Sequence, residues 1–154
     1  MREQNYSIGQ QAEQRMCTLL KELGATEIVQ GNHNAIPDVS FTLFTKTWCA
    51  ELKSVLFLHS SSRIGVAKIS RTEFDGMNAL SGEKCIIIEL RHQGSRSHNY
   101  IWIPYGSISE LFASNSAMAS MTISWILNHG VNLAAWFLSE SLDMDLTSVL
   151  VNGG

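Results

Sequence analysis

Three polar residues that could act together in chemistry interrupt two apolar segments of the sequence. The segment IPDVSFTLF carries Asp38, and the segment TWCAELKSVLFL carries Glu51 and Lys53. Carboxylate oxygens are the ligands that hard divalent cations such as Mg²⁺ prefer, and an amine beside them can orient water or offset negative charge. Close carboxylates also repel one another unless a cation lies between them. These residue types favour metal-assisted chemistry at one point of the fold.

The two apolar segments are expected to form a β-hairpin that brings the three side chains together. Both segments are rich in β-branched and aromatic residues, and Thr45–Thr47 between them suits a turn. Side chains of a strand alternate between its faces, so Glu51 and Lys53 point the same way. A turn near Thr45 places Asp38 opposite about position 51 to 53, within cross-strand reach of both.

The rest of the sequence predicts helices and strands around this hairpin. Apolar residues at helical spacing predict a helix from about Ile8 to Leu23, opened by a capping box at Ser7 and Gln10. Glu13 lies on or beside the buried stripe of this helix, which is unusual for a carboxylate. Further expected elements are a strand at ATEIVQ, a helix at RTEFDGMNAL capped by Ser70, a central strand at KCIIIEL, a strand at YIWIP and one or two helices in the C-terminal part.

Length and composition indicate one globular domain that spans residues 1–154. Apolar residues make up 45% of the chain and charged residues 16%, which argues against disorder. No apolar run approaches the roughly 20 residues needed to cross a bilayer, and the N-terminus lacks the apolar core of a signal peptide, so we expect a cytoplasmic protein without a membrane partner. Cys17, Cys49 and Cys85 are widely spaced and predict small buried hydrophobes, not a disulfide framework or a zinc site.

Pro37-Asp38, followed after twelve residues by Glu51-Leu52-Lys53, resembles the active-site motif of the PD-(D/E)XK nuclease superfamily. Upstream, the segment from Gly9 to Glu13 resembles the G-x-x-x-E helix of archaeal Holliday-junction resolvases. The resemblance covers about residues 7–90. It implies an α/β fold with a restriction-endonuclease-like core, in which a central mixed β-sheet is flanked by helices.

The same resemblance implies a role for each residue of the motif in cleaving a phosphodiester. Asp38 and Glu51 would each give a carboxylate oxygen to Mg²⁺, for which Mn²⁺ would substitute, and the carbonyl of Leu52 would give a third ligand. Glu13 would complete the cluster or hold a second ion. Lys53 would orient or deprotonate the attacking water, or offset the charge that develops on the phosphate.

Each of these residues also has a purely structural interpretation. Glu51 and Lys53 suit an exposed pair on the solvated face of an antiparallel sheet. Glu13 suits a salt bridge with Arg15 or Lys46 at the helix boundary, and Asp38 suits the turn chemistry that follows a proline. The joint placement of these residues on two adjacent strands and one helix favours the metal site.

The charge balance bears on the substrate. The chain has 11 Lys and Arg against 14 Asp and Glu, a net charge of −3, whereas the resolvases that it resembles are basic because they hold phosphate backbones. An enzyme that reads bases through polar loops needs fewer charges. We therefore expect a site-specific double-strand DNA endonuclease, similar to the compact intron-encoded homing endonucleases of bacteria. The alternatives are a Holliday-junction resolvase and a non-catalytic nucleic-acid-binding or assembly protein. Charge and loop placement predict DNA contacts at Arg63, Lys68, Arg71, Arg91 and Arg96.

A single small domain with one site cannot cut both strands of a duplex at once. We therefore expect a homodimer or homotetramer on double-stranded DNA. Large apolar residues gather in the C-terminal part, among them Met118, Met121 and Trp125. They predict a core, and residues from about 107 to 154 are also candidates for a subunit contact.

Overall fold

A computed structural model of the chain describes residues 2–31, 36–57, 66–92, 94, 96–112 and 116–152. In chain order, its elements are α1 (Arg2–Glu22), β1 (Thr26–Gln30), β2 (Val39–Leu43), β3 (Lys46–Phe57), β4 (Val66–Ser70), α2 (Arg71–Asn78), β5 (Glu83–His92), β6 (His98–Pro104), the 3-10 helix η1 (Tyr105–Leu111), β7 (Met118–Thr122), α3 (Ile123–His129), β8 (Val131–Asn132) and α4 (Leu133–Asn152). Among these helices, none combines the length and the apolar character that crossing a bilayer requires.

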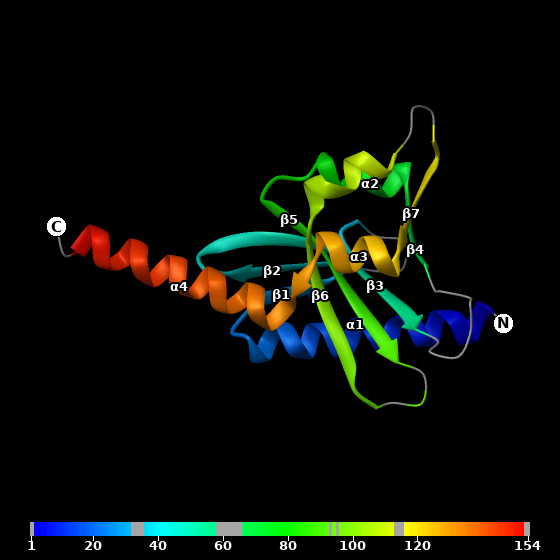
Figure 1. Cartoon of the computed structure of the whole chain (residues 1–154), viewed down its shortest axis with the longest axis horizontal. Coiled ribbons are helices and arrows are strands. Elements are labelled where there is room, and N and C mark those ends of the chain that lie inside the picture. The colour runs from blue at the N-terminus through cyan, green and yellow to red at the C-terminus, as the bar shows by residue number, and fades with distance from the viewer. Residues whose placement is uncertain are drawn as a thin grey trace.

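The elements form a central mixed sheet covered on both faces (Figure 1). Its six strands lie in the order β1-β2-β3-β5-β6-β8, and β4 pairs with β7 in a separate two-stranded sheet. Strands β3 and β5 are parallel, whereas β2 and β6 run antiparallel to these neighbours. The crossover through β4 and α2 supplies the long connection that two parallel strands need. The expected mixed sheet flanked by helices is confirmed.

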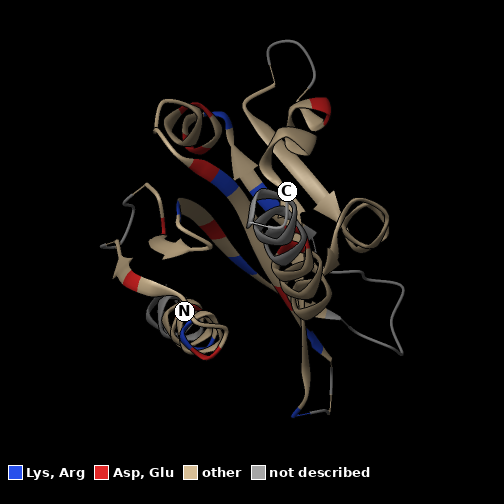
Figure 2. Cartoon of the chain, turned by 90° about the vertical axis from the view of Figure 1, so that its left-hand side faces the viewer, with Lys and Arg blue, Asp and Glu red and all other residues tan. Residues whose placement is uncertain are grey.

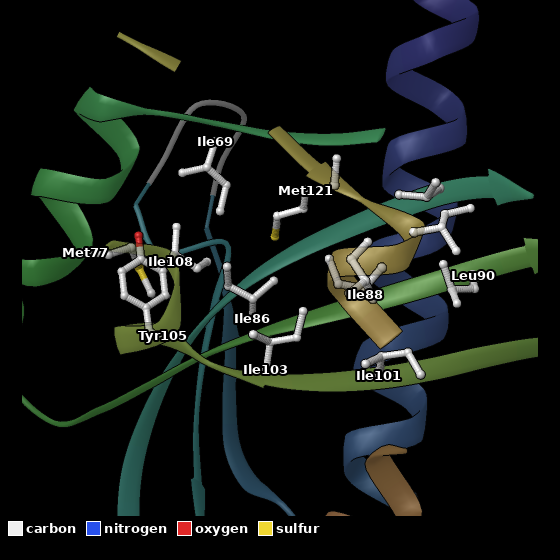
Figure 3. Packing of buried hydrophobic residues seen from close by; sticks show 14 of the residues in the cluster. Ile69, Met77, Ile86, Ile88, Leu90, Ile101, Ile103, Tyr105, Ile108 and Met121 are labelled. Atoms are coloured by element: carbon white, nitrogen blue, oxygen red, sulfur yellow. The ribbon is translucent and has the colours of Figure 1, made fainter. Parts of the chain in front are cut away.

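Two apolar clusters hold the layers together, one on each face of the sheet. The first packs β4, α2, η1, β7 and α3 against the sheet, and Figure 3 shows Ile69 and Met121 facing Ile86 and Ile88 of β5. The second packs α1 and α4 against the other face, with Met16, Leu20 and Leu133 among its members. Residues 85–90 of β5 are all buried because both faces of this central strand are covered.

The β2–β3 hairpin turns at Phe44 and Thr45, one residue earlier than the expected Thr45–Thr47. Both residues have positive φ, 56° and 60°, which a bulky or β-branched residue rarely adopts. The Phe44 ring packs on Trp136 and Phe137 of α4, at centroid distances of 6.1 and 5.2 Å. Contacts from a distant helix therefore support a turn that these two residue types disfavour locally.

Three local expectations differ from the structure. Helix α1 begins at Arg2, so Ser7 lies inside the helix and the expected capping box at Ser7 and Gln10 does not start it. Residues 66–70, for which the sequence predicted no strand, form β4. The C-terminal part holds η1 and two short strands besides α3 and α4. Strands β4, β7 and β8 are short, and their pairing partners are distant in sequence, so local periodicity did not reveal them.

Candidate active site

The hairpin register brings Asp38 beside Glu51 and Leu52. Val39 pairs with Ala50, so the residue before Val39 falls opposite the residue after Ala50. The backbone amide of Leu52 donates a hydrogen bond of 2.9 Å to Oδ2 of Asp38. The backbone carbonyl of Asp38 accepts a second bond, of 2.8 Å, from the amide of Gly31. Asp38 is thus held through both its side chain and its main chain, next to the strand that carries Glu51.

Glu51 is a buried acid whose hydrogen-bonding capacity is not filled. Its side chain lies in the sheet with 1% of the residue exposed, and its Oε1 has no hydrogen-bond partner in the described part of the chain. Burial, and then the negative charge of Asp38, raise the pKa of Glu51 to about 9, although the positive charge of Lys53 acts in the opposite direction. The interpretation of Glu51 as an exposed strand residue is therefore wrong.

Glu13 reaches the same neighbourhood from α1. The residue is half-buried beside Ala12 and Met16, which pack against the sheet. Burial raises the pKa of Glu13, the negative charge of Asp38 raises it further, and the charge of Lys53 opposes both effects. Glu13 is therefore close enough to interact electrostatically with both Asp38 and Lys53. The suggested salt bridge of Glu13 with Arg15 is not formed, because the Arg15 guanidinium binds Glu89.

Lys53 projects from β3 and is held by an acid that sequence reasoning missed. Its Nζ lies 3.1 Å from Oε2 of Glu73 in α2, and both side chains are partly exposed. Burial alone would raise the pKa of Glu73, but the charge of Lys53 and the hydrogen bonds of Ser70 outweigh burial and lower it. The available signal was the spacing Ser70-x-x-Glu73, since a glutamate at the third position of a helix belongs to a capping box.

A second polar cluster lies on the α1 face of the sheet. Glu89 of β5 is fully buried and accepts two hydrogen bonds of 2.8 Å from Arg15, one from Ser54 and one from Tyr100. Burial acts to raise the pKa of Glu89, but these bonds outweigh burial and lower it. Because both of its oxygens are engaged, Glu89 serves to anchor α1 on the sheet.

The polar cluster around Asp38, Glu51 and Lys53 has the donor chemistry of a divalent-cation site. Its carboxylates outnumber its ammonium groups, with Glu13, Asp38, Glu51 and Glu73 against Lys53. Oε1 of Glu51, which is buried and has no partner within the described ranges, is the kind of atom that a hard cation satisfies. Within the described ranges, however, no three His, Cys, Asp or Glu side chains already surround a common point. The residues fit Mg²⁺ or Mn²⁺ in type and charge, and binding would require their side chains to adjust.

The five predicted DNA contacts have different surroundings. Arg63 lies outside the described residues, whereas Lys68 on β4 and Arg96 before β6 are exposed. The Nε of Arg71 donates to the carbonyl of Ser116, with the guanidinium over the Phe112 ring. The Nε of Arg91 donates to Oγ of Ser54. In Figure 2, basic and acidic segments alternate along the central strands and do not form one basic face in this view.

Comparison with known proteins identifies the fold. No family model and no curated protein sequence matches the chain. Among solved structures, the chain is similar to Hjc from Archaeoglobus fulgidus, a Holliday junction resolvase of an archaeal hyperthermophile. The TM-score is 0.60 at 14% sequence identity, over 84% of this chain and 94% of that chain. The chain thus has the α/β fold of this solved structure, in agreement with the restriction-endonuclease-like core that the resemblance at Asp38, Glu51 and Lys53 implies.

Proposed function

We propose that the protein is a metal-dependent nuclease that hydrolyses phosphodiester bonds in DNA. The observation that carries this proposal is the placement of Asp38 opposite Glu51, with Lys53 two residues farther along the same face of β3. These positions match the nuclease motif within a fold of the same type. Fold alone does not determine activity, so the proposal depends on the chemistry of these side chains.

Each residue has a task that its surroundings support. Asp38, Glu51, the carbonyl of Leu52 and Glu13 would hold the divalent cation. When bound, Mg²⁺ supplies charge stabilisation at the phosphate and a more acidic water. The amide of Leu52 orients Asp38. The Lys53 ammonium adds a positive charge beside the acids, where it can offset negative charge that develops on the phosphate.

For the substrate, we favour a four-way DNA junction over a homing site. The likeness to a Holliday junction resolvase over most of both chains supports the resolvase alternative and not the homing interpretation. One observation keeps duplex cleavage at a specific site as a second candidate. The net charge of −3 is low for a protein that grips four duplex arms through their phosphates.

Cleavage of two strands requires two copies of the site, and we infer that α4 contributes to their association. Leu138 and Leu142 lie one turn apart on α4 and are 61% and 60% exposed. Figure 1 shows α4 extending beyond the edge of the sheet toward the C-terminus. Such apolar side chains suit a contact with a second copy. Changing both leucines to glutamate should convert a dimer to a monomer in light scattering, and an unchanged mass would contradict this assignment.

One experiment separates the three functions. The protein is incubated in Mg²⁺ with a mobile four-way junction and with a library of duplex sites, and Lys53→Ala serves as the matched control. Paired nicks in the junction that Lys53→Ala abolishes support a resolvase, and cutting of particular duplexes supports the second candidate. If neither substrate is cut and Mg²⁺ causes no Asp38-dependent shift in melting temperature, the chain is a non-catalytic protein of this fold.

A further inference from the structure

One carboxylate links the start of α2 to the amine of the candidate site. Oε1 of Glu73 accepts a hydrogen bond of 3.2 Å from the amide of Ser70, and Oε2 binds Nζ of Lys53 at 3.1 Å. In return, Oγ of Ser70 accepts a bond of 3.0 Å from the amide of Glu73. The bond from the Ser70 amide to Oε1 therefore orients the Glu73 side chain and directs its second oxygen to Lys53.

Lys53 needs such a partner because the neighbouring acids offer its ammonium more than one possible ion pair. A lysine side chain is a flexible stem with a compact charge, and two acids of the candidate site, Glu13 and Glu51, lie near enough to attract it. Among the described contacts, the ammonium binds Glu73, which comes from another element. The bond holds Lys53 beside Glu51, whose Oε1 has no hydrogen-bond partner among the residues that the structure describes.

Helix α2 is also packed against the segment that leads to Asp38. A Cβ on Gly76 would lie 2.8 Å from Cδ1 of Ile36, so the helix approaches this segment at a residue without a side chain. Ile36 stands two residues before Asp38. The same short helix thus touches the chain next to the aspartate and binds the lysine directly, which lets it set the distance between the two.

We propose that Glu73 is a positioning residue for Lys53 in the nuclease reaction. It holds the ammonium in place beside the carboxylates and prevents it from pairing with Glu51. This inference rests on the proposed function for its catalytic consequence, but the ion pair itself is independent of that function. Glu73 would act through Lys53, without contacting the substrate.

Two variants separate this role from helix capping. Glu73→Gln keeps a side chain that can close the capping box but removes the charge that binds Lys53. Ser70→Ala removes the cap hydroxyl and keeps the carboxylate. We expect Glu73→Gln to lower single-turnover cleavage by about 10- to 100-fold with unchanged affinity for DNA and an unchanged melting temperature. Ser70→Ala should lower the melting temperature and leave the cleavage rate close to that of the wild type.

A second readout needs neither metal nor DNA. The chain has five lysines, so the ammonium signal of Lys53 can be assigned in a ¹⁵N spectrum of the metal-free protein by comparison with Lys53→Arg. We expect slow hydrogen exchange at this ammonium in the wild type and in Ser70→Ala, and fast exchange in Glu73→Gln. An unchanged ammonium signal and an unchanged exchange rate in Glu73→Gln would overturn the proposal. Parallel losses of cleavage rate and melting temperature in Glu73→Gln and Ser70→Ala would also overturn it. If the wild-type protein cleaves nothing, the proposed function fails, and the ammonium spectrum still decides whether Glu73 holds Lys53.

Discussion

The amide of Leu52 donates a hydrogen bond of 2.9 Å to the carboxylate of Asp38, which ties the residue before β2 to the strand that carries Glu51. This bond orients one acid opposite another that is almost fully buried. Burial, and then the negative charge of Asp38, raise the pKa of Glu51 to about 9. Such an arrangement costs stability and is typical of a functional site.

Asp38→Asn should separate the effect of the Asp38 charge on stability from its effect on cleavage. The amide oxygen of asparagine still accepts the bond from Leu52, and the repulsion with Glu51 and Glu13 disappears. We expect the metal-free protein to melt at the same or a higher temperature. Cleavage should fall by at least about 100-fold, because a charged ligand at the reacting centre is lost. Asp38→Ala is the control, since it also leaves the Leu52 amide unpaired and should melt lower. Full activity in Asp38→Asn would remove Asp38 from the site.

The stability of the metal-free protein should fall as the pH rises. The pKa of Glu51 is about 9 in the folded protein and close to the ordinary 4.5 in the unfolded chain. The folded state therefore keeps a proton that the unfolded state has lost. The stabilisation of the protonated form is complete below about pH 4.5 and disappears as the pH approaches about 9. Glu13, whose pKa is also raised, acts in the same direction.

Thermal melts of wild type and Glu51→Gln across this range measure the effect. Glutamine cannot ionise, so the stability of the variant should fall much less than that of the wild type between about pH 5 and about pH 9. At alkaline pH it should be more stable than the wild type. Parallel curves for the two proteins would show that Glu51 does not titrate in this range.

Mg²⁺ or Mn²⁺ should stabilise the wild-type fold. A ligand that binds only the native state raises the free energy of unfolding by about 2.7 kcal/mol at 100 times its dissociation constant. The shift should grow with pH, because the cation competes with the proton on Glu51. Chelator should reverse it, and Asp38→Asn should abolish it. Calorimetry that finds equal shifts in wild type and Asp38→Asn would place the cation elsewhere.

Arg15→Ala should be strongly destabilising although Arg15 is itself partly exposed. Its loss leaves the fully buried Glu89 with bonds only from Ser54 and Tyr100 among the contacts described here. Removing one partner of a buried ion pair costs about 3 to 5 kcal/mol, and we expect about 2 to 3 kcal/mol here because the Arg15 side chain is 37% exposed. Urea unfolding measures the loss. The exposed Arg96→Ala serves as the control, expected within about 0.5 kcal/mol of wild type, and an equal loss in both would contradict the anchoring role.

The two residues of the hairpin turn should respond to glycine in opposite directions. Thr45 is exposed, and glycine relieves the strain of its positive φ, so Thr45→Gly should raise the free energy of unfolding by about 0.5 kcal/mol. Phe44→Gly relieves similar strain but removes the ring that packs on Trp136 and Phe137. It should therefore lower stability by about 1 to 2 kcal/mol. Chemical unfolding of both variants tests this, and a gain in Phe44→Gly would show that the ring contacts contribute little.

Local periodicity was sufficient to predict the hairpin, the first helix and the central strand. Alternation along residues 48–55 places Glu51 and Lys53 on one face, and the two apolar clusters bear out this alternation. Counting back from the turn places Asp38 opposite about position 51 to 53, and the observed register places it opposite Glu51. The residues that form the turn were less predictable, because the contacts that support Phe44 come from α4, at the other end of the chain.

The sequence by itself implied the fold class through its resemblance to a nuclease motif. It also determined that Asp38, Glu51 and Lys53 share one end of the hairpin, because strand periodicity and hairpin pairing act over short separations. Only the tertiary structure decided that Glu73 binds Lys53 across 20 positions and that Arg15 binds Glu89 across 74. These contacts depend on how α1 and α2 dock on opposite faces of the sheet. The packing of whole layers sets that docking, and no local pattern in the chain encodes it.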